Sequence, residues 1–164
     1  MDTETLKTSD LVFTRVFNAP VETVWQAWSN PEYVQQWWGP NGFTCPSASI
    51  DFRVGGTSLL CMNAPEYGDL YNTFQYREII PTKQIKFISN LADKDGKKID
   101  PASIGMPADF PQELFYILSF EDLGNRKTKL TVIELDWPHG QMMEMSRMGM
   151  EQCLDKMAAI FAKH

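Results

Sequence analysis

The sequence contains few cysteine and histidine residues, and this shortage excludes several kinds of site. Cysteine occurs three times in 164 residues and histidine twice. Cys45, Cys61 and Cys153 are far apart and form neither a Cys-x-x-Cys pair nor the spacing of a zinc site. We therefore expect three buried free thiols, no metal site and no other cofactor. Free thiols are typical of a reducing compartment, so we expect a cytoplasmic protein.

Long apolar runs and clustered basic residues are also missing. No stretch approaches the roughly 20 apolar residues of a membrane helix. The start of the chain, MDTETLK, lacks the charged and then apolar pattern of a secretion signal. The formal net charge is −6, whereas nucleic-acid-binding domains present a basic stripe. We expect neither a membrane nor a nucleic acid as a partner.

The remaining composition is that of an ordinary globular domain, with 43% hydrophobic and 22% charged residues. A chain of 164 residues fits one domain with a substantial core. We expect residues 1–10 to be disordered or loosely held, and residues 11–164 to form the single domain.

Hydrophobic periodicity predicts an α+β protein. Residues 11–18 are rich in β-branched and aromatic side chains, which is typical of a strand. Apolar residues then recur at helical spacing in two short segments, around Val24 and around Val34. Alternation and turn residues predict six further strands, over residues 43–52, 57–63, 71–80, 84–90, 113–121 and 128–137.

The last segment, residues 141–163, has helical periodicity and no proline. One long helix covers only one face of a seven-stranded sheet, so we expect the sheet to curl around it. The helix is rich in methionine, whose unbranched side chain adapts to irregular shapes. These methionines either fill the core or face a cavity.

A long polar segment, residues 91–112, connects two of the predicted strands. Loops of this length inside a compact domain are usually functional or mobile. The segment is therefore either a lid over a site or a surface insertion without a role.

Four motifs suggest a family. They read FNAPVETVW (residues 17–25), WWGPNGF (37–43), DFRVGG (51–56) and YREIIP (76–81). Together they resemble the family of activator of heat-shock-protein ATPase homologues, within the START-like, birch-pollen-allergen-like and polyketide-cyclase (SRPBCC) superfamily. The resemblance extends from about Leu11 to Phe161.

The resemblance implies a helix-grip fold, in which a curved seven-stranded antiparallel sheet holds the C-terminal helix and two short helices follow the first strand. In many relatives the cavity between sheet and helix binds apolar small molecules. Many members are dimeric, so a homodimer is also implied. Members often have Gly-Trp in the last helix, where this sequence has Gly149-Met150.

We expect the lining of this cavity to come from three places. Residues at three- and four-residue spacing on the last helix would form its roof. Aromatic and aliphatic residues of two strands would form its floor, on faces chosen by alternation. A tryptophan and the long loop would flank its entrance. The predicted ligand-binding residues are Trp38, Phe74, Tyr76, Met106, Phe115, Ile117, Met145, Gly149, Cys153 and Met157.

The sequence predicts no catalytic residue. His139 lies in a turn, and no nucleophile is paired with it in the sequence. Glu134 and Asp136 alternate with apolar residues that include Trp137. Since the apolar face is interpreted as the inner one, both carboxylates are expected to face solvent.

Three functions remain open. The first is binding of an apolar or amphipathic small molecule, without turnover. The second is a cyclase- or hydrolase-type enzyme that uses the same cavity, which a buried Glu or His in contact with a Tyr would favour. The third is a co-chaperone-like interaction protein, which would expose a large apolar surface patch.

Overall fold

The computed structural model of the protein describes residues 7–163. The order of elements is the one that periodicity predicts, with one additional short 3-10 helix, η1. The elements are β1 (Thr8–Phe17), α1 (Val21–Ser29), α2 (Pro31–Trp37), β2 (Thr44–Ser49), β3 (Thr57–Ala64), β4 (Gly68–Ile80), β5 (Gln84–Ala92), η1 (Pro101–Ile104), β6 (Leu114–Gly124), β7 (Lys127–Pro138) and α3 (Gln141–Phe161).

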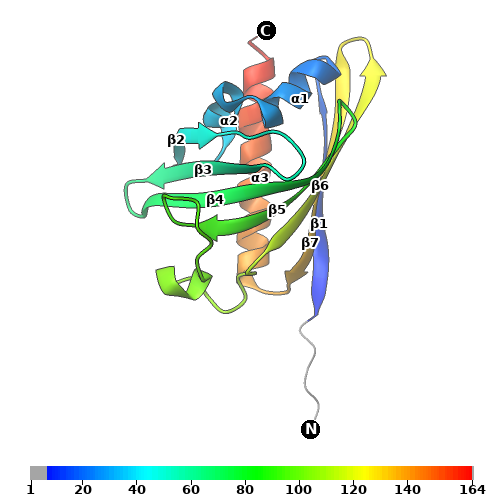
Figure 1. Ribbon diagram of the computed structural model, residues 1–164. Coiled ribbons are helices and arrows are strands. Elements are labelled where there is room, and N and C mark those ends of the chain that lie inside the picture. Colours follow the sequence, from blue (N-terminus) through cyan, green and yellow to red (C-terminus); the bar gives the residue numbers. More distant parts are fainter. Residues whose placement is uncertain (1–6, 164) are drawn as a thin grey trace.

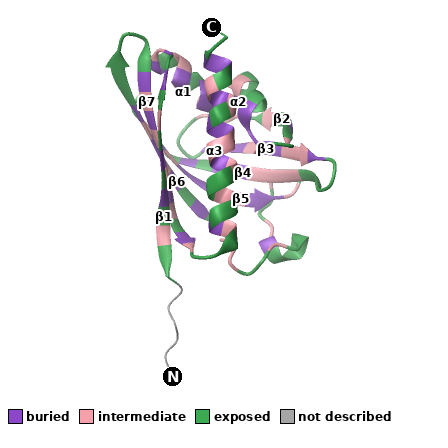
Figure 2. Ribbon diagram, turned by 180° about the vertical axis from the view of Figure 1, so that it is seen from behind, coloured by how far each residue is buried: buried purple, intermediate pink, exposed green. Residues whose placement is uncertain are grey.

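The seven strands form one antiparallel sheet in the order β1-β7-β6-β5-β4-β3-β2. The sheet is curved and α3 crosses one of its faces, as the two opposite views show (Figures 1 and 2). The buried side of α3 faces the sheet (Figure 2) and carries Met150, Leu154 and Met157. The helix-grip fold expected from the resemblance is therefore confirmed.

The two short helices close one end of the curved sheet. Asn30 ends α1 and starts α2, since its side-chain oxygen accepts a hydrogen bond from the backbone N–H of Glu32. The indole Nε1–H of Trp37 donates to the carbonyl oxygen of Ala27 at 2.7 Å, and its ring packs on Trp28 with centroids 4.5 Å apart. These contacts fix the position of the turn that follows α2.

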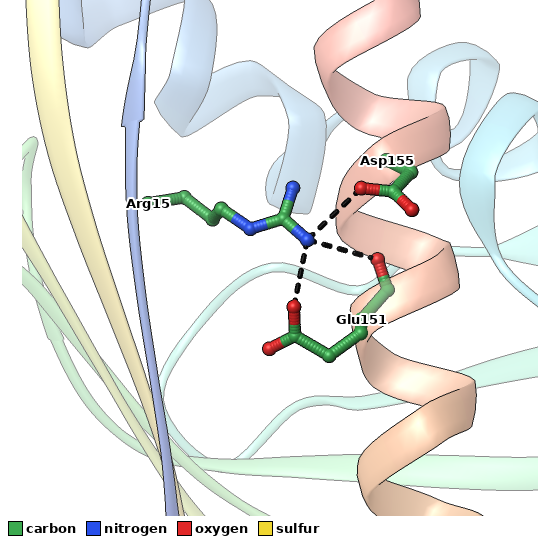
Figure 3. A network of polar contacts seen from close by, with 3 residues as sticks. All are labelled: Arg15, Glu151 and Asp155. Carbon is green, nitrogen blue, oxygen red and sulfur yellow. Dashed lines mark hydrogen bonds and ion pairs between the residues drawn. The ribbon is translucent and has the colours of Figure 1, made fainter.

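Two basic side chains attach α3 to the rest of the domain. Arg15 on β1 contacts the carboxylates of Glu151 and Asp155 at 2.8 and 2.9 Å (Figure 3). The Nζ of Lys156 donates to three carbonyl oxygens of residues 39–43, at 2.7, 3.1 and 3.2 Å. The helix is thereby held between β1 and the turn after α2.

The first strand starts earlier than expected. β1 begins at Thr8, because Thr8 and Ser9 already pair with Pro138 and Trp137 of β7. The rest of the N-terminal segment that we expected to be loosely held, residues 1–6, lies outside the described residues. Within residues 7–163 no helix is long and apolar enough to cross a membrane.

Candidate functional site

A cavity of about 570 Å³ lies between the sheet and the N-terminal half of α3. Its lining comes from the turn after α2, from β3, β4 and β5, from the segment before β6, and from β6, β7 and α3. Figure 1 shows the η1 segment at the same end of the molecule as the start of α3, away from α1 and α2. The volume is in the range of about 300–1,000 Å³ that small-molecule sites occupy.

Half of the predicted ligand-binding residues line this cavity, namely Trp38, Met106, Met145, Gly149 and Cys153. The last three belong to the predicted roof on α3. A Cβ atom at Gly149 would lie 3.7 Å from the Cβ of Pro40, which is an ordinary contact. Gly149 therefore faces the turn after α2 and the cavity, and no strand packs directly against it.

Three other predicted residues lie in the core and do not line the cavity. The Phe74 ring stacks on Phe87 with centroids 4.1 Å apart, and the Tyr76 hydroxyl is 2.7 Å from the Oγ of Ser58. Met157 is fully buried in the same core. On β4 the predicted face is the inner one, but the residues of that face that line the cavity lie nearer the start of the strand, namely Leu70 and Asn72.

On β6 the structure corrects the predicted face. Phe115 is 38% exposed and Ile117 is half-buried, while their neighbours Leu114 and Tyr116 are buried and line the cavity. Both faces of this strand carry large apolar side chains, so alternation alone could not show which face is inside. Phe115 and Ile117 therefore lie on the opposite side of the sheet from the cavity.

The structure also corrects the position of Glu134, which faces the interior and not the solvent. Between the pairs Ser9–Trp137 and Leu11–Glu134, one residue of β1 stands opposite two of β7. This β-bulge contains Asp136 at φ 57°, whose N–H donates to the Oδ1 of Asp10 at 2.9 Å. The extra residue shifts the alternation, so Glu134 and Trp137 both point inward.

The Glu134 carboxyl lies at the cavity wall and is fully buried. Its Oε1 accepts a hydrogen bond from the Trp137 indole at 2.8 Å and a long one from the Ser146 hydroxyl at 3.4 Å. Its Oε2 has no hydrogen-bond partner among the described residues. Burial raises the pKa of Glu134 to about 7, although the polar groups of Trp137, Tyr116 and Ser146 beside the carboxyl act in the opposite direction.

Two further titratable groups of the lining stand beside Glu134. Burial, followed by the charge of Glu134, raises the pKa of Tyr116 well above its ordinary value. Burial raises the pKa of the Cys153 thiol to about 11. Both groups are therefore neutral at physiological pH. No Lys, Arg or His side chain lines the cavity in the described part of the chain.

The lining contains buried polar atoms without partners. Across residues 7–163 four buried side-chain polar atoms lack a hydrogen bond. Three of them belong to residues that line the cavity: Trp38, Asn90 and Glu134. Buried polar groups are normally paired, so unpaired ones beside a cavity indicate where a bound molecule could supply the partner. No cluster of His, Cys, Asp or Glu in the same residues could hold a metal ion.

The long segment expected to be a lid or an insertion forms part of the cavity wall, through residues 106–107 and 110–111. The Phe110 ring packs edge-on against Trp137, with centroids 6.2 Å apart. The Oδ2 of Asp109 accepts a hydrogen bond from the N–H of Met142, in the first turn of α3, at 3.4 Å. Since Gly140 offers no side-chain cap, this loop supplies the cap of the helix.

Comparison with known proteins agrees with this arrangement. The sequence matches the family described as Activator of Hsp90 ATPase homolog 1-like protein over residues 18–162. No curated protein matches it. A crystal structure of a protein from Chromobacterium violaceum has a TM-score of 0.75 at 24% identity, covering 93% of this chain and 96% of that one. A protein from Silicibacter pomeroyi has a TM-score of 0.74 at 22% identity, covering 95% and 100%. At these identities the likeness shows the fold alone.

Proposed function

Because the chain belongs to the Activator of Hsp90 ATPase homolog 1-like family, we propose that it binds an apolar or amphipathic small molecule in the cavity under α3, without turnover. The observation that carries the proposal is the cavity itself, which has the volume of a ligand site and mainly apolar walls. Among the side chains of these walls are Trp38, Met62, Phe110, Leu114 and Met150. Burial of an apolar ligand against such walls would supply the free energy of binding.

The part of the 91–112 segment that follows β5, residues 93–112, would act as the lid of this site. It contributes to the wall and also holds the start of α3 through Asp109. Opening it would separate Phe110 from Trp137, which gives a ligand access to the interior without unfolding the sheet. Lid loops that close over a site commonly move on the microsecond to millisecond timescale.

A glycine-to-leucine change in the roof tests the proposal. Gly149→Leu places a branched side chain between Pro40 and the cavity. We expect it to reduce the affinity for a neutral apolar dye, such as Nile red, at least tenfold while circular dichroism stays unchanged. The control is Met148→Leu on the same helix, at a position that is 62% exposed. Unchanged dye affinity in Gly149→Leu would contradict the proposal.

The buried carboxyl favours a second candidate, an enzyme of the cyclase or hydrolase type. A carboxyl with a pKa of about 7 can both donate and accept a proton at neutral pH. Glu134 would be the general acid or base, and Tyr116 would orient the substrate. In that case Glu134→Gln would bind the substrate and fail to convert it. The third function, co-chaperone-like interaction through an outer apolar patch, has less support because the structure contains a cavity of the size of a ligand site.

A further inference from the structure

We propose that the molecule bound in this cavity carries a protonated amine, which pairs with the free oxygen of Glu134. The inference rests on the proposed function and names the chemical class of the ligand: an apolar body with one cationic head group.

The hydrogen bonds of Glu134 leave one oxygen for a ligand. Oε1 already accepts from Trp137 and Ser146, whereas Oε2 accepts no hydrogen bond from the described residues, although the Tyr116 hydroxyl lies beside the carboxyl. The carboxyl is fully buried and belongs to the cavity lining. A buried charged oxygen without a partner is strongly destabilising, so a donor supplied by the ligand would gain more here than at an exposed site.

The charges around Glu134 favour a cation. The titratable groups that face it are Tyr116 from β6 and Cys153 from α3, and both are neutral at physiological pH. No basic side chain of the described residues lines the cavity to neutralise the carboxylate. A cationic ligand would supply the counter-charge that the cavity lining lacks.

This pairing couples binding to the release of a proton. Because burial raises the pKa of Glu134 to about 7, part of the free molecules hold this proton at pH 7. An ammonium beside the carboxyl favours the carboxylate, so binding at this pH should release protons. The affinity for the amine should accordingly rise as the pH increases through 7 and level off above it.

A matched series of ligands tests the inference. Isothermal titration calorimetry at pH 8 would compare n-octylamine, 1-octanol and octanoate, which share one chain and differ in the head group. We expect the wild type to bind octylamine at least about tenfold more tightly than octanol. Glu134→Gln should lose this preference and keep its affinity for octanol. Glu144→Gln, in the same helix as Ser146 but with a side chain that is 68% exposed, should behave like the wild type.

The possible outcomes separate the two proposals. Equal affinity for octanol and octylamine, preference for octanoate, or an amine preference that persists in Glu134→Gln would each overturn the amine inference and leave the proposed function standing. If none of the three compounds binds, both fall. If Glu134→Gln fails to fold, the wild type alone can test the inference. Octylamine is then titrated at pH 7 in two buffers of different ionisation enthalpy, and the binding enthalpy should differ between the buffers because a proton is released. Absence of proton release refutes the inference.

Discussion

Glu134 should make the protein less stable as the pH rises towards neutrality. Its pKa is about 7 in the folded protein, against an ordinary value of 4.5. Between these two values the folded state holds a proton that the unfolded state has released, so the free energy of unfolding falls as the pH increases. The stabilising contribution is complete below about pH 4.5 and is lost once the pH exceeds about 7. At about 1.4 kcal/mol per pKa unit the total change is about 3 kcal/mol.

Glu134→Gln isolates this effect. The amide has the shape of the protonated carboxyl, and its oxygen can still accept the hydrogen bond of Trp137. It cannot ionise, so the cost of burying a charge disappears. We expect the variant to match the wild type at pH 4.5 and to be about 3 kcal/mol more stable at pH 8.

Urea denaturation followed by tryptophan fluorescence, at several pH values between 4.5 and 8, would measure the difference between variant and wild type. Taking the difference removes the contributions of all other titrating groups, which the two proteins share. Glu144→Gln is the control for a loss of charge at an exposed position. If the difference stays constant with pH, or if Glu134→Gln is the less stable protein at pH 8, the assignment of a buried carboxyl with a raised pKa is wrong.

Three other predictions concern the core, the anchoring of α3 and the assembly. Tyr76→Phe removes the hydroxyl that lies 2.7 Å from the Oγ of buried Ser58, so the free energy of unfolding should fall by about 1 kcal/mol. The affinity for the dye should not change, because Tyr76 lies outside the cavity lining. Lys156→Met removes the donor to three carbonyl oxygens of residues 39–43, which should lower stability by about 1–3 kcal/mol and weaken dye binding, as both denaturation and titration would show. The homodimer stays a prediction: sedimentation at micromolar concentration should show a species of twice the chain mass, and a single 18.8 kDa species would count against it.

The elements of the fold could be predicted because the signals for them are local. Pro20, Asn30-Pro31 and the Gly39-Pro40 turn delimit the two short helices, and the structure places α1 and α2 between them. The methionine-rich segment without proline becomes α3, from Gln141 to Phe161. Each of these signals depends on a few neighbouring residues, so it can be recognised without knowing how distant parts of the chain pack.

The cavity lining could be predicted only where a motif or a helical face defined it. Trp38 lies in the WWGPNGF motif, and Met145, Gly149 and Cys153 share one side of α3. The inner face of β6 was chosen wrongly, because Phe115 and Ile117 are as apolar as their neighbours. Which of two apolar faces is covered depends on where α3 packs, and that is a property of the whole sheet.

The sequence by itself therefore determined the order of elements and the fold family, and it placed Met145, Gly149 and Cys153 of α3 on one face, whereas the tertiary structure decided which residues line the cavity and the chemistry inside it. Leu130 and Val132 are in phase with Glu134, and this was the only sequence signal that the carboxylate faces inward. Trp137 suggested the opposite alternation, because it is an odd number of residues from Glu134 and yet also points inward. The bulge in β7 explains this, and it forms where the Oδ1 of Asp10 on β1 accepts the N–H of Asp136. These two residues are 126 positions apart in the chain. A contact over that separation is made only when β1 and β7 pair, so the local pattern alone could not decide which of the two alternations places Glu134.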